Sequence, residues 1–211
     1  IKVGNVVPSL KVADVSYNTE QIKQAILDHQ DCSILLFPEL CISGYTCADL
    51  FAHDALLEAS KKALVEIASI VAQQLIVVGA ALKYHNSLYN CAVYISQGKI
   101  IGIVPKIYIP TYSEFYESRW FTSGKEIKDT YIQFGNDKVP FSKTLLVEDP
   151  QSGAVVGCDI CEDLWVADKP STHACLAGAN IIVNLSASDE LIGKEDYRRS
   201  MVSQQSSSCY C

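Results

Sequence analysis

Three reactive side chains each directly follow an apolar run that is typical of a buried strand: Glu39, Lys106 and Cys161. In α/β proteins, ligands bind at the carboxyl ends of strands, because the loops there present side chains from a rigid frame. A carboxylate, an ammonium group and a thiol that reach the same edge of a sheet would form one site. This combination is typical of acyl transfer from an amide through a thioester.

Each residue type has a role in that chemistry. A free thiol has a pKa of about 8.5, and a nearby ammonium group stabilises the thiolate, so Lys106 is expected to lower the pKa of Cys161. Glu39 is the candidate general base, which takes the thiol proton and then returns it to the leaving amine. Lys106 and the backbone N–H of Glu162 are the candidate donors to the oxyanion.

The same residue types also have structural interpretations. A glutamate after a proline often serves as a turn carboxylate or a helix cap. A lysine after Val-Pro is commonly a solvated edge residue, and a cysteine in an apolar segment is commonly a small core residue. Each residue alone is more often structural, whereas all three at strand ends favour a site. Spacing alone leaves both interpretations open.

The elements that must position these residues alternate along the chain. Apolar runs bounded by Pro, Gly or polar residues predict strands, and apolar residues at helical spacing predict helices. We expect strands at 2–7, 33–37, 75–82, 88–95, 99–104, 144–147, 154–160 and 180–185. We expect helices at 55–74, 170–177, 195–208 and 18–29, the last with Asn18 as a possible cap. Two consecutive strand pairs, 88–104 and 144–160, are expected to be hairpins.

Helices that alternate with apolar strands, together with two hairpins, predict an α/β fold with helices on the faces of a mixed sheet. The strands are too many for one small open sheet, so we expect two packed sheets with outer helical layers. No linker or repeat divides the 211 residues, and we interpret them as one domain. The apolar run Cys209–Cys211 predicts the start of another strand, so we expect the domain to continue beyond it.

Composition limits the classes of function. Apolar residues make up 49% of the chain and charged residues 19%, which excludes a disordered chain and suggests that more than one surface is covered. The net charge of −7 provides no basic field for nucleic acid. Nine scattered cysteines are typical of reduced thiols, and neither a signal peptide nor a membrane span is visible. We therefore expect a soluble cytoplasmic protein that does not contact membranes.

Five short motifs, in order, resemble those of the nitrilase (carbon-nitrogen hydrolase) superfamily. They are Phe37-Pro38-Glu39-Leu40 with Gly44-Tyr45 and Asp49-Leu50, Val104-Pro105-Lys106 with Tyr112 and Glu117, the run from Asp159 to Trp165, the run from Asn184 to Ser188, and Gly193-Lys194. The last three motifs are similar, more narrowly, to the N-terminal glutaminase domain of glutamine-dependent NAD(+) synthetases. The resemblance covers essentially the whole chain.

The resemblance implies a four-layer α-β-β-α sandwich, truncated at its C-terminal end, in which residues 1–211 form a glutamine amidohydrolase domain. Glu39, Lys106 and Cys161 correspond to the Glu-Lys-Cys triad of the family. L-glutamine would be hydrolysed to glutamate, and ammonia would pass through a tunnel to a C-terminal synthetase domain of the same polypeptide. There, ATP with Mg²⁺ would adenylate deamido-NAD, and ammonia would displace AMP. Because the family is generally oligomeric, a homo-oligomer is expected.

The resemblance also implies substrate-binding positions. Tyr45 and Tyr112 match aromatic residues that line the pocket, and Glu117 matches a second glutamate near the nucleophile, which would bond the lysine or the substrate amide. Ser188 and Lys194 fall where the α-amino and α-carboxylate groups of glutamine bind. Some members of the family have an arginine where this chain has a lysine, and a point charge does not replace bidentate recognition of a carboxylate.

Two departures from the family pattern affect the interpretation. Cys158 and Asp159 replace an apolar residue and a glutamate, and Cys158 with Cys161 makes a CxxC motif, which in isolation suggests a redox or metal site. A structural zinc site needs four ligands, and the sequence offers neither a second CxxC nor a nearby His pair, so we expect no metal and place Cys158 in the core. No glycine-rich phosphate loop is present, so ATP and NAD chemistry lies outside these residues and we expect no cofactor in this chain.

Two alternatives remain. One is a free-standing nitrilase-family amidase that acts on another small amide. The other is a non-catalytic module, with a nitrilase fold or the CxxC motif, that binds a partner or a metal.

Overall fold

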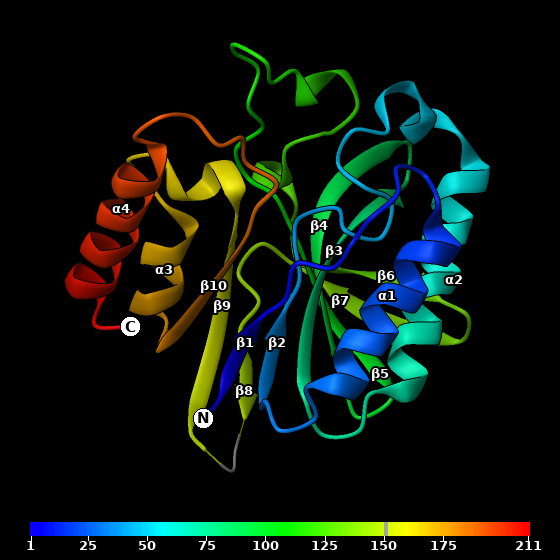
Figure 1. Cartoon of the computed structure of the whole chain (residues 1–211), viewed down its shortest axis with the longest axis horizontal. Helices are drawn as coiled ribbons and strands as arrows, with labels where there is room; N and C mark the ends of the chain where they lie inside the picture. The colour runs from blue at the N-terminus through cyan, green and yellow to red at the C-terminus, as the bar shows by residue number, and fades with distance from the viewer. Residues whose placement is uncertain (150–151) are drawn as a thin grey trace.

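The computed structural model describes residues 1–149 and 152–211, which are arranged in four layers (Figure 1). In order across the molecule, the layers are helices α1 and α2, a seven-stranded sheet, a three-stranded sheet, and helices α3 and α4. The α-β-β-α sandwich predicted from the sequence is therefore confirmed.

The larger sheet has the strand order β1-β2-β3-β4-β5-β7-β6. Its strands are β1 (Val3–Asn5), β2 (Ile34–Leu36), β3 (Leu75–Tyr84), β4 (Ser87–Ser96), β5 (Lys99–Pro105), β6 (Thr130–Phe134) and β7 (Asp137–Phe141). The smaller sheet, ordered β10-β9-β8, contains β8 (Val147–Asp149), β9 (Ala154–Ile160) and β10 (Ile181–Leu185). β1, β2 and β3 run parallel, as do β9 and β10, whereas β4 is antiparallel to both of its neighbours.

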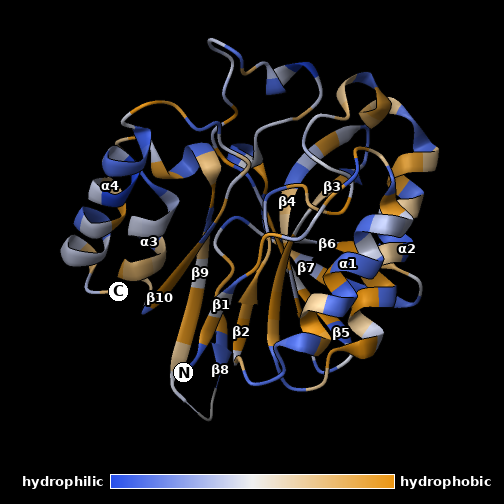
Figure 2. Ribbon diagram, in the orientation of Figure 1, coloured by the Kyte–Doolittle hydropathy of each residue, from blue (hydrophilic) through white to orange (hydrophobic). Residues whose placement is uncertain are grey.

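Helices cover both outer faces of the sheets. They are α1 (Val15–Asp28), α2 (Asp54–Ile70), α3 (Pro170–Leu176) and α4 (Lys194–Cys209). Short 3₁₀ helices lie in the connections of the described chain: η1 (Ala48–Ala52), η2 (Glu117–Arg119), η3 (Gly124–Glu126) and η4 (Cys161–Leu164). Figure 2 shows that central strands such as β2 are hydrophobic, whereas β8 and most of α4 are hydrophilic. No described residue of α4 is buried.

Two apolar cores hold the layers together. The first lies between α1, α2 and the larger sheet, and it includes Ile22, Ile26, Leu35, Leu64 and Ile67. The second lies between the two sheets, and it includes Val77, Tyr94, Val156, Cys158, Ile160 and Val183. Full burial of a side chain such as valine or leucine contributes about 1.5–3 kcal/mol. The second core therefore fixes the position of one sheet relative to the other, and Cys158 lies within it as predicted.

The predicted cap of the first helix is wrong. The helix begins at Val15, and the side chain of Asp14 caps it by accepting a hydrogen bond from the Tyr17 N–H at 3.0 Å. Asn18 is buried inside the helix, where its Nδ2 donates to the carbonyl of Ile42 at 3.1 Å. Asn18 therefore supports the turn that follows β2 instead of capping the start of the helix.

Other boundaries also differ from the sequence-based ones. The second helix ends at Ile70, and the strand predicted at 144–147 is β8, at Val147–Asp149. The turn of that hairpin includes residues 150–151, which lie outside the described residues. The β6–β7 hairpin was not predicted; its strands pair so that Phe134 faces Asp137 across a two-residue turn.

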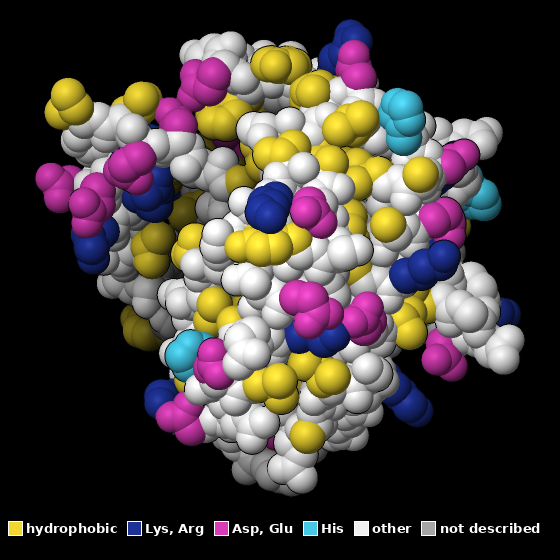
Figure 3. All heavy atoms as spheres, turned by 45° about the vertical axis from the view of Figure 1, so that its right-hand side comes forward, with side chains coloured by type: hydrophobic (Ala, Val, Ile, Leu, Met, Phe, Trp, Pro, Cys, Tyr) yellow, Lys and Arg dark blue, Asp and Glu magenta, His cyan; other side chains and the backbone are white. Residues whose placement is uncertain are grey.

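Figure 3 shows that acidic and basic side chains are interspersed on the face that α1 and α2 cover. Lys23 of α1, for example, forms ion pairs with Glu20 and with Glu66 of α2. None of the described helices combines the length and apolarity that crossing a membrane requires.

Candidate active site

Glu39 lies in the turn that follows β2, and this turn packs directly on β3. The Ile42 N–H donates to the carbonyl of Gly79 at 3.3 Å. A Cβ atom at Gly79 would lie 2.3 Å from the backbone nitrogen of Leu40 and 2.7 Å from the carbonyl carbon of Glu39. Only glycine therefore allows the two backbones to approach this closely. This contact places the Glu39 carboxylate at the carboxyl end of β2.

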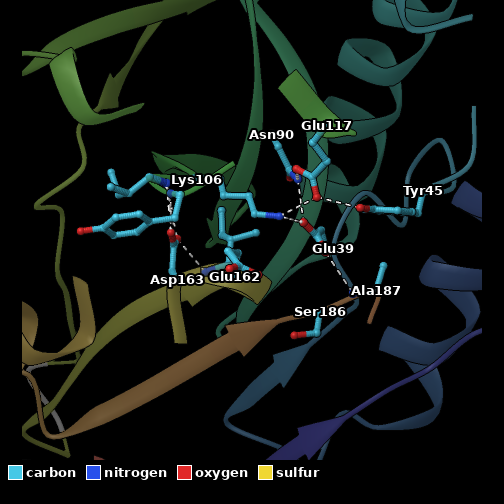
Figure 4. Close-up of polar contacts among 12 residues, drawn as sticks. Glu39, Tyr45, Asn90, Lys106, Glu117, Glu162, Asp163, Ser186 and Ala187 are labelled. Carbon is cyan, nitrogen blue, oxygen red and sulfur yellow. Dashed lines mark hydrogen bonds and ion pairs between the residues drawn. The ribbon is translucent and has the colours of Figure 1, made fainter. Parts of the chain in front are cut away.

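Lys106 follows β5 and is fully buried between two carboxylates (Figure 4). Its Nζ lies 2.7 Å from Glu39 Oε1 and 2.7 Å from Oε1 of Glu117, which begins η2. The hydroxyl of Tyr45 donates to the same Glu117 oxygen at 2.7 Å. The structure thus brings together four of the predicted site residues.

Asn90, in β4, is a site residue that the sequence analysis missed. Its Nδ2 donates to Glu39 Oε1 at 2.7 Å and to Glu117 Oε2 at 3.5 Å. Its buried Oδ1 has no hydrogen-bond partner among the described residues. Asn90 was the one strongly polar residue between apolar neighbours in the predicted strand 88–95, and buried polar groups need partners. That was the available signal.

The smaller sheet reaches the other oxygen of Glu39. The backbone N–H of Ala187, after β10, donates to Glu39 Oε2 at 3.0 Å. Glu39 therefore accepts hydrogen bonds from Lys106 and Asn90 on one oxygen and from the opposite sheet on the other. Its carboxylate spans the junction of the two sheets.

Cys161 lies at the carboxyl end of β9, where η4 begins, and only 5% of it is exposed. Its φ of +46° is uncommon for a residue other than glycine, and such a conformation persists only where the surrounding structure holds it. The charges of Glu39, Lys106 and Glu117 all act on the Cys161 thiol, so it belongs to the same buried site.

The predicted lowering of the Cys161 pKa is wrong for the free protein. Burial raises the pKa of the Cys161 thiol to about 12, and the carboxylates of Glu39 and Glu117 act in the same direction. Lys106 acts to lower this pKa, as predicted, but it does not outweigh burial. The thiol is therefore protonated at neutral pH and needs a base when it reacts.

Burial and neighbouring charges shift the pKa values of the groups around Cys161. Burial acts to lower the pKa of Lys106, but Glu39 and Glu117 outweigh it and raise that pKa, so Lys106 is an ammonium group. Burial raises the pKa of Glu117, and Lys106 opposes this effect. Burial also raises the pKa of Tyr45, which stays a hydrogen-bond donor.

The remaining predicted site residues lie outside this network. The hydroxyl of Tyr112, which is 53% exposed, donates to Glu162 Oε2 at 2.8 Å. Lys194 forms an ion pair with Asp189, and its Nζ lies 5.3 Å from the centroid of the Trp165 ring. The Ser188 hydroxyl donates to the carbonyl of Asp189 at 3.5 Å. None of these contacts involves Glu39, Lys106 or Glu117.

The backbone N–H of Glu162 is in the first turn of η4, where N–H groups have no partner within the helix. It is therefore suited to donate to an oxyanion formed beside Cys161. Within the described part of the chain, no group of three or more His, Cys, Asp or Glu side chains is arranged to hold a metal ion. The nine cysteines, all of which are described, are free thiols.

The sequence matches a family model described as "Carbon-nitrogen hydrolase" over residues 3–207. A curated relative is the "Glutamine-dependent NAD(+) synthetase" of Mycobacterium tuberculosis, which is 40% identical over 185 residues. That alignment covers 86% of this chain but only 27% of the relative.

Solved structures resemble the chain over nearly its whole length. The crystal structure of a glutamine-dependent NAD(+) synthetase from Cytophaga hutchinsonii superposes with a TM-score of 0.88 at 29% identity, covering 98% of this chain and 34% of that one. A Nesterenkonia amidase from the nitrilase superfamily superposes with a TM-score of 0.73 at 15% identity, covering 97% of this chain and 71% of that one, which shows the shared fold alone. The chain therefore spans about a third of the synthetase structure it matches.

Proposed function

The chain belongs to the carbon-nitrogen hydrolase family, and from this we propose that it hydrolyses the side-chain amide of L-glutamine to glutamate and ammonia. The observation that carries the proposal is the buried ammonium group of Lys106, held between Glu39 and Glu117 beside the Cys161 thiol. The substrate comes from the glutamine-dependent synthetases that the chain resembles.

In the first half of the reaction, Cys161 Sγ attacks the carbonyl carbon of the amide, and the thiol proton passes to Glu39. Glu39 Oε2 is the oxygen suited to take this proton, because it faces the smaller sheet, where it accepts a hydrogen bond from the Ala187 N–H. Lys106 Nζ and the Glu162 N–H donate to the oxyanion of the tetrahedral intermediate. The carbon–nitrogen bond then breaks, Glu39 returns the proton to the nitrogen, and ammonia leaves a γ-glutamyl thioester on Cys161.

In the second half, water attacks the thioester carbonyl while Glu39 takes a proton from the water. The intermediate collapses, the carbon–sulfur bond breaks, and the proton returns to the sulfur of Cys161 as glutamate leaves. Glu117 takes no proton in this scheme. It holds Lys106 in place through the 2.7 Å ion pair, and the Tyr45 hydroxyl holds Glu117.

The outer residues provide groups that could recognise the rest of the substrate. Lys194 and Ser188 would bind the α-carboxylate and α-amino groups of glutamine, and the Lys194 ammonium group lies over the Trp165 ring. Tyr112, hydrogen-bonded to Glu162, would cover the pocket above Cys161. Because Lys194 is paired with Asp189, the two together offer one charge of each sign to a zwitterionic amino acid.

We also propose that residues 1–211 act as the glutaminase domain of a larger cytoplasmic and homo-oligomeric enzyme. The ammonia would be used by a C-terminal synthetase domain that amidates deamido-NAD to NAD. ATP and Mg²⁺ would serve that second reaction, and the chemistry proposed for this chain uses no cofactor. The support is the similarity to synthetases, of which the matched region makes up 27% in the curated relative and 34% in the solved structure.

A substrate comparison tests the proposed function. The full-length protein is incubated with L-glutamine, with L-asparagine and with butyramide, which lacks both α-substituents, and release of ammonia is measured. We expect kcat/KM for glutamine to exceed the other two by about 100-fold or more. Butyramide leaves the groups that bind the α-substituents unpaired, and asparagine is one methylene too short to reach those groups and the nucleophile together. Lys194→Ala should reduce that preference.

The other outcomes identify the alternatives. Equal hydrolysis of butyramide and glutamine would favour a free-standing amidase for small amides. No hydrolysis of any amide would favour a non-catalytic binding module.

A further inference from the structure

Asp163 is a buried carboxylate that the proposed reaction does not use. It is the third residue of η4 and is 2% exposed. Its Oδ1 accepts hydrogen bonds from the backbone N–H of Tyr108 at 2.8 Å and of Ile107 at 3.2 Å. Its Oδ2 accepts from the N–H of Ile160 at 3.1 Å. Burial raises the pKa of this carboxyl group to about 7, whereas the three backbone donors hold its two oxygens in place.

The three donors come from both sheets. Ile107 and Tyr108 directly follow Lys106, at the end of β5 in the larger sheet. Ile160 ends β9 in the smaller sheet and directly precedes Cys161. One side chain therefore joins the two backbone segments that carry the ammonium group and the thiol, and Figure 4 shows dashed contacts running from Asp163 in two directions.

A neighbouring carboxylate provides a contrast. Asp159 is equally buried and lies in β9, but its Oδ1 accepts from the N–H of Ser171 at 2.7 Å, at the start of α3. Its Oδ2 has no partner among the described residues. Asp159 therefore joins β9 to the outer helical layer, whereas Asp163 joins β9 to the larger sheet.

We propose that Asp163 is a positioning residue that fixes Cys161 Sγ relative to Lys106 Nζ across the two sheets. The conformation of Cys161, with φ at +46°, needs such support, because it is not one that the residue adopts by itself. A displacement of about 1 Å between reacting groups can reduce a rate about 100-fold. The kinetic part of this inference rests on the proposed function.

Two matched variants test the inference in the full-length protein. Asp163→Asn and Asp159→Asn each replace one buried carboxyl group near Cys161 in the chain by its neutral amide. In Asp163→Asn, the remaining oxygen can still accept a hydrogen bond from the Tyr108 N–H. The new NH₂ group then faces the Ile160 N–H, and two donors cannot form a hydrogen bond with each other. We expect kcat for glutamine to fall about tenfold or more with KM changed less than about threefold. Asp159→Asn should keep kcat within about threefold of wild type.

Labelling of Cys161 by iodoacetamide gives a second readout that needs no glutamine turnover. In Asp163→Asn we expect labelling to slow about fivefold or more, because Cys161 moves away from the charge that stabilises its thiolate. If the wild type releases no glutamate but labelling is still slowed, the proposed function fails and the positioning role stands.

The inference is overturned if Asp163→Asn labels and turns over within about twofold of wild type, or if Asp159→Asn reproduces both losses. If Asp163→Asn does not fold, Asp163→Glu is measured in the same way, since it keeps the charge and moves the oxygens. Wild-type kcat and labelling in Asp163→Glu would then overturn the inference, and the same losses would support it.

Discussion

The buried site around Cys161 already contains two carboxylates and one ammonium group. A Cys161 thiolate would be a third negative charge beside those of Glu39 and Glu117, and among these groups Lys106 alone would offset it. Burial penalises that charge further. For this reason the thiol keeps its proton in the free protein, and deprotonation must accompany attack on the substrate. The sequence-based expectation considered the cation alone.

The pH dependence of Cys161 labelling tests this charge balance. Because burial raises the pKa of the thiol to about 12, the thiolate fraction below that pH should increase about tenfold per pH unit. Iodoacetamide labelling of Cys161, measured by peptide mass between about pH 6 and 10.5, should therefore rise throughout without levelling off. Glutathione is the control, since its thiol levels off near its ordinary pKa. A plateau for Cys161 below about pH 8 would instead show a preformed thiolate.

Asn90 is expected to be needed for both turnover and stability. Asn90→Ala removes a 2.7 Å hydrogen bond to the proposed base, Glu39, and leaves a buried carboxylate oxygen with one donor fewer. We expect kcat to fall about tenfold and the free energy of unfolding to fall by about 1–3 kcal/mol, measured by glutamate release and urea unfolding. The exposed Asn86, in the β3–β4 turn, gives the matched control Asn86→Ala. Wild-type turnover in Asn90→Ala would remove Asn90 from the site.

The ends of the strands could be predicted from the sequence, whereas the contacts between the two stacked sheets could not. The ends of β2, β5 and β9 are marked in the sequence by apolar runs that stop at Pro38, Pro105 and Cys161. The contact of Ala187 with Glu39 joins residues 148 positions apart, and it depends on how the two sheets stack. No local pattern encodes that stacking.

The missed β6–β7 hairpin has a local explanation. Only alternate residues of its strands are buried, including Ile132 and Phe134, so the apolar run that marks the central strands is absent. Pro140 lies within β7, and proline normally argues against a strand. The Gly135-Asn136 turn was the one available signal.

The position of Glu39 depends on the close contact between Gly79 of β3 and the turn that follows β2. In Gly79→Ala, the new Cβ would meet the backbone nitrogen of Leu40 at 2.3 Å, and backbone atoms cannot move aside as a side chain can. We expect turnover to fall about tenfold or more and the free energy of unfolding to fall by about 1–3 kcal/mol. In the control Gly102→Ala, the nearest atom is the flexible end of the Leu145 side chain. A smaller loss in Gly79→Ala than in Gly102→Ala would contradict this account.

For the whole molecule, the site depends on both sheets together. The larger sheet supplies Glu39, Asn90 and Lys106, and the smaller sheet supplies Cys161 and the Ala187 N–H. Neither sheet carries the complete set. The apolar core between them therefore determines whether these groups meet.

Cys158 tests the difference between core packing and a functional CxxC motif. It is buried between the sheets, and burial raises the pKa of its thiol to about 12. Cys158→Ala should lower the free energy of unfolding by about 1 kcal/mol, as loss of one buried heavy atom does, and leave turnover within about threefold of wild type. Urea unfolding and glutamate release measure the two effects. Loss of turnover in a folded Cys158→Ala protein would instead indicate a redox or metal role.

The proposed reaction depends above all on Cys161 as the nucleophile toward glutamine. The most direct measurement is to treat the full-length protein with an electrophilic glutamine analogue and to locate the adduct by peptide mass. We expect one adduct, on Cys161, with glutamate release lost in proportion, protection by excess glutamine, and no uptake by Cys161→Ala. An adduct on Cys158 would contradict the account, as would an unlabelled protein that releases no glutamate.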